Sequence, residues 1–472
     1  MSIFGDVNVK VEDGNLGRST STGTGIHVKI GASPVESSVP IIITSSMKAA
    51  DVKEKLGYSP LADACIDSLD GGSRTIICYP VKATTEGMVG DVTMHGDGAG
   101  TIKVKGKPNG AYDVIVRICL TGGTNAGAMQ VSIDAGKTYT EETTIPLSGE
   151  YEIPYTGLTL TFTGEGEAPF VSGDSYKFTT EAPAMSNADV LAAVDRLVNY
   201  NTAFEYVHIV GTSGKTLWAA LASAAEDFIT QYKKPLFFLC EGRNIQADES
   251  LDEYYSAMKE ERRGINTYCI SVCLAWATFY RLDLRTQDIN MAGYITGLLS
   301  QAKESQSIGE VESFGISEAK LIRLLPEGIE DYLELLNAEK YITIRQYSGL
   351  EGYYVTNANV MSPENSDYQY IEDVRVLNRI IKATRSQALK KLQIEIDPEN
   401  LDASVAVIKE YLNTALEDAQ QDKIISSGEL EIDTENLNIL VKESLDIKVS
   451  YVPMGHAREM NVSFGVSNPY KK

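Results

Sequence analysis

The sequence predicts an α/β fold (α+β overall), in which an all-β domain, a sandwich or barrel, is inserted into an α/β body. Strand and helix signals alternate before residue 84 and again after residue 183, as in parallel strands joined by crossover helices. Between these stretches, short runs of alternating polarity are separated by Gly, Asn, Asp and Pro clusters. Hydrophobic residues make up 43% and charged residues 23% of the 472 residues, which is the composition of a globular chain.

The first 25 residues predict an extended arm and not part of a folded core. Val7, Val9 and Val11 alternate with polar residues, and this period of two is a strand signal. The Gly/Ser/Thr-rich run that follows cannot bury a core of its own. We therefore expect residues 1–25 to form a short strand on a flexible arm.

The α/β body is expected over residues 26–83 and 184–340, on either side of the β insertion at 84–183. Short apolar runs predict its strands, and apolar positions three or four residues apart predict its helices. Where the body resumes, Ser186 can cap a helix because Asp189 stands three residues on. The expected strands are 39–44, 74–81, 204–210, 235–241 and 265–275, and the expected helices are 49–56, 60–69, one that opens at 186, one that ends near 232, 248–261, 317–323 and 327–337.

Residues 341–456 predict a C-terminal domain in which a helix pair accompanies a sheet. Apolar residues repeat at helical spacing through the two helices, whereas the later segments alternate as strands do. The expected elements are a strand pair at 341–346 and 352–356, a helix over 367–392, a helix that opens at Asp397 with Pro398 as its first helical residue, and strands over GELEID, LNILV, LDIKVSYV and REMNVSFGV.

The last of these strands belongs to a C-terminal arm at 457–472. Its apolar residues, Met460, Val462, Phe464 and Val466, occupy alternate positions. Three basic residues and one acidic residue give the arm a net charge of about +2, and the first 30 residues are neutral. Both ends are thus less acidic than the rest of the chain, which suits docking on an acidic neighbour.

The overall charge excludes some classes of partner. The chain has 42 Lys and Arg residues against 65 Asp and Glu residues, a formal net charge of −23, so it repels a phosphate backbone and nucleic acid is not an expected partner. The most apolar stretch, 270–280, is too short to span a bilayer, and membrane insertion is not expected. The N-terminus lacks the basic start and apolar core of a signal peptide, so we expect synthesis and initial residence in a cytoplasm.

The sequence predicts no catalytic residue, no metal site and no cofactor, and therefore no enzyme. The six cysteines stand at irregular spacings, which indicates buried, reduced thiols. Cys269 and Cys273 are close, but their spacing suits neither a redox pair nor a zinc knuckle. None of His27, His95, His208 and His456 stands in a nucleophile-elbow or HExxH context, and His208 lies in an apolar strand, as core histidines do.

One segment leaves an enzymatic alternative open. Gly211 to Thr216 (GTSGKT) follows an apolar strand and precedes a helix, which is the context of a phosphate-binding loop. A complete P-loop requires a glycine five positions before Gly214, and Ile209 stands there. A P-loop-like ATPase is the first alternative function, and an adhesin that uses the inserted β domain is the second.

The C-terminal half carries a family resemblance. The segments concerned are GYYVTNANVMSPENSDYQYIEDVRVLNRI, then ESLDIKVSYVPMGHAREMNVSFGV, and SGDSYKFTTEAP at the end of the β insertion. In this order they resemble the tail sheath proteins of contractile phages and related contractile injection particles. The resemblance covers roughly the last 300 residues, and the N-terminal strand and arm less specifically.

The resemblance implies a structural subunit that polymerises as stacked hexameric rings around an inner tube, without a nucleotide. Both terminal arms would add strands to a handshake-type sheet of neighbouring subunits. The donors would be the alternating valines at 7–11 and the apolar positions at 460–466, and the Gly-rich segment at 17–25 would act as a hinge. The receiving sheet would contain Leu445, Ile447, Val449 and Tyr451.

The same resemblance implies how the assembly works and where it is found. Contraction of the sheath would drive the tube through a cell envelope. The implied partners are other copies of the chain, the tail tube protein, and baseplate and tail terminator proteins. The implied location is the virion tail, or a phage-like contractile particle, assembled in the cytoplasm of a bacterial host.

Overall fold

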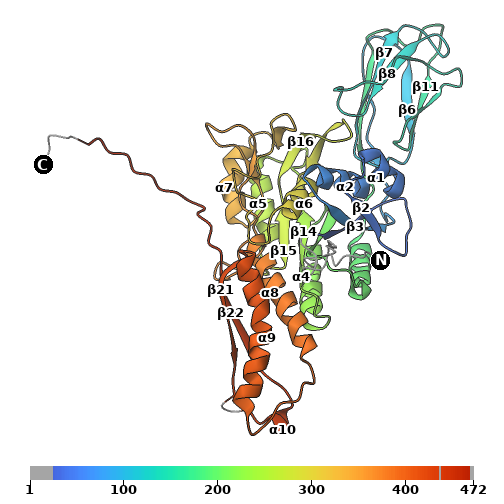
Figure 1. Ribbon diagram of the computed structural model, residues 1–472. Coiled ribbons are helices and arrows are strands. Elements are labelled where there is room, and N and C mark those ends of the chain that lie inside the picture. Colours follow the sequence, from blue (N-terminus) through green and yellow to red (C-terminus); the bar gives the residue numbers. More distant parts are fainter. Residues whose placement is uncertain (1–24, 435–436, 468–472) are drawn as a thin grey trace, which may run out of the picture.

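The computed structural model describes residues 25–434 and 437–467. The α/β body lies in the middle of the molecule, with the inserted β domain at one end and the C-terminal helices at the other (Figure 1). The expected fold class is confirmed, because a mixed α/β body is interrupted by an all-β domain. Val7, Val9 and Val11 lie outside the described residues.

The body is built on a six-stranded sheet in the order β15-β14-β13-β1-β3-β2. The first five strands in this order are parallel, and β2 is an antiparallel edge strand. The strands are β1 (His27–Ala32), β2 (Ile41–Thr44), β3 (Thr75–Val81), β13 (Tyr206–Thr212), β14 (Phe237–Glu241) and β15 (Ile270–Cys273). The helices are α1 (Ala49–Leu56), α2 (Pro60–Asp70), α3 (Asn187–Asp195), the 3-10 turn η1 (Arg196–Asn199), α4 (Lys215–Thr230), α5 (Leu251–Arg262) and α6 (Ala292–Gln301).

The sequence pattern does not predict β1, although this strand lies in the middle of the sheet. Its apolar run is interrupted by His27 and Lys29, which are both fully buried. The Lys29 Nζ atom lies 2.7 Å from His208 Nδ1 and 2.8 Å from Thr296 Oγ1. These tertiary hydrogen bonds, which no local pattern shows, allow polar side chains to occupy a buried strand.

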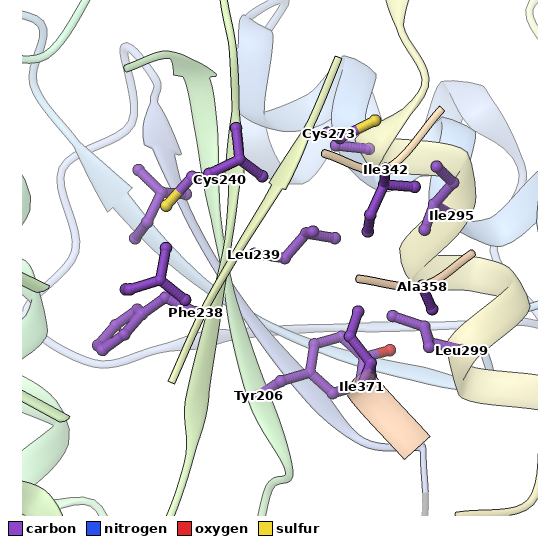
Figure 2. Close-up of a cluster of buried hydrophobic side chains, with 14 of the residues drawn as sticks. Tyr206, Phe238, Leu239, Cys240, Cys273, Ile295, Leu299, Ile342, Ala358 and Ile371 are labelled. Carbon is purple, nitrogen blue, oxygen red and sulfur yellow. The ribbon is translucent and has the colours of Figure 1, made fainter. Parts of the chain in front are cut away.

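One hydrophobic core joins the sheet to the start of the C-terminal helices (Figure 2). Leu239 of β14, Ile295 and Leu299 of α6, and Ile371 of α8 (Ile371–Lys390) are all buried in it. Burying each such side chain stabilises the fold by about 1.5–3 kcal/mol. The first turn of α8 is therefore held firmly against the body.

The outer edge of β15 is covered by two later segments of the chain. The backbone N–H of Ile342 donates to the Val272 carbonyl over 2.9 Å, and that of Met361 donates to the Ile270 carbonyl over 2.8 Å. The short strand pair β19 (Ile344–Arg345) and β20 (Tyr354–Val355) lies within the expected pair, and η2 (Ile329–Tyr332) and α7 (Leu333–Ala338) cover the helix expected at 327–337.

The helix expected at 317–323 is wrong. This region contributes β18 (Leu321–Leu325) to a three-stranded sheet with β16 (Trp276–Tyr280) and β17 (Thr286–Asn290). Leu321 and Leu324 are buried and stand three residues apart, a spacing that imitates a helix. A register shift between β16 and β18 at Thr278 and Phe279 accounts for that spacing within a strand.

The inserted domain packs two antiparallel sheets around a hydrophobic core of its own. Val114 and Val116 of one sheet meet Leu160 and Phe162 of the other in this core. The two chain crossings into the domain are paired by the bridge between Thr85 and Ala184. Its strands are β4 (Met88–Val89), β5 (Thr93–His95), β6 (Thr101–Gly106), β7 (Asp113–Leu120), β8 (Ala128–Ser132), β9 (Thr143–Thr144), β10 (Glu150–Ile153), β11 (Leu158–Thr163) and β12 (Ser175–Glu181).

The C-terminal domain contains α8, α9 (Leu401–Gln421), β21 (Ile425–Ile432), α10 (Ile439–Lys442) and β22 (Ile447–Pro453). The expected helix start at Asp397 and Pro398 is wrong, because the Asp397 carboxylate accepts the Glu399 N–H in a local turn and α9 begins later. The strand expected over LNILV is also wrong. This run forms the short helix α10, since consecutive apolar residues do not distinguish strand from helix.

Candidate assembly interface

The two-stranded sheet of the C-terminal domain packs one face on the helix pair. Strands β21 and β22 are antiparallel, with Leu430 opposite Val449 and Gly428 opposite Tyr451. Leu430 is fully buried against α9 residues such as Leu412 and belongs to the same hydrophobic cluster. The opposite face of the sheet, which includes Val452, is exposed.

The predicted receiving residues lie in and next to this sheet. Ile447, Val449 and Tyr451 occupy alternate positions of β22, while Leu445 precedes the strand. Leu445, Val449 and Tyr451 are partly buried against the hydrophobic cluster of the helices, whereas Ile447 is exposed at the start of the strand. Burial raises the pKa of Tyr451. Apolar positions of an added strand would extend this layer.

Both outer edges of the sheet are open. Within residues 25–434 and 437–467, β21 and β22 pair with each other and with no third strand. A two-stranded sheet is marginally stable, and an unpaired edge presents N–H and C=O groups that another strand can use. The sheet therefore has the geometry of an acceptor for β-strand addition.

The predicted donor at the C-terminus lies in an extended tail that runs away from the body (Figure 1). Residues 454–467 form no regular secondary structure, so the strand expected over REMNVSFGV is absent from the subunit. An alternating run has no ladder without a partner strand. Its apolar side chains are exposed: Met460 by 78%, Val462 by 69%, Phe464 by 94% and Val466 by 103%. A row of large apolar side chains exposed on an extended segment marks an interaction site.

The segment Gly211 to Thr216 lacks the geometry of a phosphate-binding loop. Gly214 is the N-cap of α4, and the backbone N–H of Lys215 donates to the Glu261 carboxylate over 2.7 Å. A carboxylate from α5 thus occupies the helix N-terminus at which a phosphate would bind. The Lys215 ammonium lies 3.4 Å from the Glu260 carbonyl oxygen, also on α5.

The cavity at the carboxyl ends of β1, β13 and β14 has the wrong charge for a nucleotide. It encloses about 450 Å³ between the body and the inserted domain, and Glu241, Asp67 and Asp288 line it. Arg281 also lines the cavity, but its Nε atom lies 2.8 Å from the Asp67 carboxylate. Such a lining repels phosphate groups.

His208 is a satisfied core histidine, as its apolar surroundings predict. Its Nδ1 faces Lys29 Nζ, and its Nε2 lies 2.9 Å from Glu241 Oε1. Burial, reinforced by Lys29, lowers the pKa of His208 well below its usual range. Burial also lowers the pKa of Lys29 to about 8 and raises that of Glu241 to about 7. Lys29 and His208 are fully buried, so neither can reach a substrate.

The cysteines expected to be buried and reduced carry no disulfide in the structure. Cys269 and Cys273 are buried and form no disulfide, and the same holds for Cys65, Cys78 and Cys240, whereas Cys119 is partly exposed. In the part of the chain that the structure describes, no three His, Cys, Asp or Glu side chains gather to hold a metal ion. No helix among these residues has the length and hydropathy to cross a membrane.

Comparison with solved structures identifies the class of fold. The chain matches the sheath tail protein of Desulfitobacterium hafniense with a TM-score of 0.50 and 13% identity, over 96% of this chain and 100% of that one. It also matches a chain of the anti-feeding prophage baseplate in the contracted state, with a TM-score of 0.52 and 10% identity, over 100% of this chain and 98% of that one. The protein has the fold of contractile-tail sheath proteins.

Family models assign the chain more narrowly. The DUF2586 N-terminal domain matches residues 4–359, and the DUF2586 C-terminal domain matches residues 367–471. The chain belongs to the DUF2586 family. Comparison with curated proteins gives no match.

Proposed function

We propose that this protein is the structural subunit of a contractile tail sheath. The observation that carries the proposal is the pairing, in one chain of sheath-protein fold, of an open two-stranded sheet with an exposed, alternating apolar tail. The tail has no partner strand within the described residues, and the sheet lacks strands at both edges. Two subunits can therefore supply to each other what each lacks.

The number of arms that could donate a strand equals the number of sheet edges that could accept one. Each sheet has two free edges, and each chain has two predicted arms, at 1–25 and 457–472. If each arm occupies one edge of a neighbour, every sheet becomes four-stranded, which is a stable size. Met460, Val462, Phe464 and Val466 would then face the helix pair, in register with Val449 and Tyr451.

Charge favours the same pairing for the C-terminal arm. Residues 425–453, which contain the receiving sheet, carry six acidic and two basic side chains. The arm at 457–472 carries three basic residues and one acidic residue. Complementary charge accelerates encounter and discriminates against wrong partners.

On this proposal the subunits stack as hexameric rings around an inner tube and shorten as a lattice to drive the tube through a cell envelope. The partners are other copies of the chain, the tail tube protein, and baseplate and tail terminator proteins at the ends. The chain needs no cofactor or nucleotide, binds no nucleic acid, and works in the tail of a virion or phage-like particle assembled in the host cytoplasm. The free energy of contraction would be stored in the lattice.

Electron microscopy of the purified full-length chain, with and without its tube protein, tests the proposal. We expect hollow, ring-stacked cylinders from the natural sequence and none from Phe464→Asp, because a carboxylate cannot enter the apolar layer on the helix pair. Ser463→Asp is the matched control, since it places the same charge on the other face of the same strand. Equal assembly by the two variants, or a natural chain that forms no cylinders under either condition, would contradict the proposal.

A further inference from the structure

The C-terminal tail is clamped to the body at one residue before it leaves. Arg458 Nη2 lies 2.5 Å from Glu372 Oε1, and Arg458 Nη1 lies 3.0 Å from Asn357 Oδ1. The guanidinium stacks 3.4 Å from the centre of the Tyr370 ring. Beyond this point, residues 459–467 are exposed. The tail therefore has a fixed root and a free end.

The acceptor of this clamp is itself immobile. Glu372 is 2% exposed and stands in the first turn of α8, where the helix N-terminus favours a carboxylate. A charge-assisted hydrogen bond to a buried partner is roughly twice as strong as a neutral one. If Arg458 moved away, the buried Glu372 carboxylate would lose its ion-pair partner. This cost favours the state in which Arg458 stays bound to Glu372.

The N-terminal root is held in the same region. The backbone N–H of Gly25 donates to the Glu205 carboxylate, and the Ser300 hydroxyl donates to the Gly25 carbonyl over 2.6 Å. Gly25 has a φ of +74°, and a Cβ there would lie 2.3 Å from the Ser300 carbonyl oxygen. Only glycine fits, so the backbone direction at this position is dictated by its contacts.

Helix α8 connects the two roots. Arg375 Nε lies 2.8 Å from Glu205 Oε2, while its two NH groups donate to the carbonyls of Ala302 and Lys303 over 3.2 Å. Arg375 is 2% exposed, and although burial opposes its charge, Glu205 raises its pKa. Glu372 and Arg375 stand three residues apart, so they lie on neighbouring positions of the helix surface.

Residues 300–305 are the second element that touches both roots. Ser300 bonds Gly25 at the start of this segment, and the Ser305 carbonyl oxygen lies 2.9 Å from His456 Nε2, two residues before Arg458. Arg375 joins the middle of the segment to α8. Both roots thus rest on one hydrogen-bonded unit made of Glu205 and residues 300–305 and 371–375, which we term the arm junction.

We propose that the arm junction fixes the direction in which the C-terminal tail leaves the body at Arg458 and the backbone direction at Gly25, with Glu372 and Glu205 as the positioning residues. The inference rests on the proposed function, because arm direction matters only if the arms reach neighbouring subunits. A shared support couples the arms: a change at one root alters the other. In an assembly whose subunits move as rigid bodies, this coupling would transmit movement of one arm to the other.

Limited trypsin digestion of the unassembled full-length chain measures the clamp directly. Trypsin must take the Arg458 side chain into its specificity pocket, so cleavage between Arg458 and Glu459 requires the clamp to open. We expect Glu372→Gln to accelerate release of the fragment that begins at Glu459 by about tenfold, since a charged pair is lost. Glu364→Gln, which changes an exposed carboxylate nearby, is the matched control and should leave the rate unchanged.

Equal cleavage rates in the natural chain and Glu372→Gln would overturn the positioning role of Glu372. If Glu372→Gln does not fold, Asn357→Ala removes another contact of the same guanidinium and is expected to give a smaller acceleration, of about threefold. No acceleration in Asn357→Ala would then overturn the clamp.

Ser300→Ala tests whether the junction is shared. The substitution removes a hydrogen bond to Gly25 and touches no residue of the tail. We expect it to accelerate cleavage at Arg458 by about two- to threefold, because the unit that supports the tail is loosened. An unchanged rate would show two independent roots and overturn the coupling. These digestions use subunits alone, so their outcome is separate from whether the chain forms a sheath.

Discussion

The inserted β domain and the C-terminal domain differ in whether their own strands complete the hydrophobic core. The insertion packs two sheets against each other around Val114, Leu160 and Phe162, and so completes a core by itself. The C-terminal domain leaves two strands on a helix pair and an apolar tail in solvent. The first domain is self-sufficient, whereas the second is a half-structure that a neighbouring chain can complete.

We expect the largest difference between the two domains when the C-terminal tail and the inserted domain are deleted in turn. Removing 459–472, which keeps Arg458 in place, should abolish cylinder formation while the subunit stays folded, because these tail residues contribute nothing to the core. Removing 86–183 and joining Thr85 to Ala184 through two glycines should preserve cylinders, since these residues already pair in the structure. Electron microscopy and thermal melting of both variants check the outcome. Cylinders without the tail, or their loss without the insertion, would contradict the comparison.

A matched pair of core substitutions tests whether the C-terminal sheet, and not the inserted domain, is needed for assembly. Leu430→Ala in β21 and Leu160→Ala in β11 each truncate a fully buried leucine and should each cost about 2–5 kcal/mol of stability. We expect the first to raise the concentration needed for assembly well above that of the second, because it disturbs the receiving sheet. Denaturant titration and sedimentation of polymer measure the two effects. Equal assembly thresholds would argue against the receiving role of the sheet.

The buried histidine His208 makes the stability of the body depend on pH. The folded-state pKa of His208 lies below the unfolded value near 6.5, so acidification below that value favours the unfolded state, which binds the additional proton. The body of His208→Gln should therefore lose less stability than the natural body, by up to about 1.4 kcal/mol per pH unit. Trp218 and Trp276 both lie in the body, so tryptophan fluorescence reports its unfolding.

The pH dependence of stability must be compared between the variant and the natural chain, because buried carboxylates stabilise the folded state as the pH falls, whereas His208 destabilises it. Burial raises the pKa of Glu241 to about 7 and that of Asp67 to about 6. These groups take up protons in the folded state first, so they favour folding as the pH falls through that range. Parallel pH profiles for the natural chain and His208→Gln would contradict the assignment of a neutral, buried His208.

The smallest expected effect is at the P-loop-like segment. Lys215→Ala should change stability by less than about 0.5 kcal/mol and leave assembly unchanged, because Lys215 only borders α5. ATP should not raise the melting temperature of the natural chain, since Glu261 already accepts the N–H at the helix start. An ATP-dependent stabilisation that Lys215→Ala removes would revive the ATPase alternative.

The sequence pattern predicts the elements that are stabilised by contacts between residues close in sequence, such as helix caps. The Ser186 and Asp189 capping box of α3 and the run Ala49–Leu56 of α1 are found where the pattern placed them. The sequence pattern does not predict β1, because Lys29 is stabilised by His208 and Thr296, which lie far away in sequence. It predicts a helix in place of β18, because the register shift of this strand is imposed by a neighbouring strand.

The sequence pattern predicts only part of the candidate interface. Val449 and Tyr451 lie on the face of β22 that packs against the helices, whereas Ile447 is exposed. The role of these residues as a receiving surface, and of the apolar run at 460–466 as a donor, stays a prediction. The arm junction was not predictable, because Glu205, Ser300, Glu372 and Arg458 come from four separate parts of the chain. Arg458 in particular gives no sequence signal beyond the charge of the tail.

The clamp at Arg458 affects whether the C-terminal tail pairs with the sheet of its own subunit or with the sheet of a neighbouring subunit. A tail tethered to its own sheet would have an effective concentration in the millimolar range and would outcompete tails of other chains. Beyond Arg458, residues 459–467 leave in a direction away from the body (Figure 1) and pair with neither strand of the subunit's own sheet. A clamp that points the tail outward therefore disfavours pairing of the tail with its own sheet. A longer, flexible linker after Pro453 should therefore turn a polymerising chain into a closed monomer.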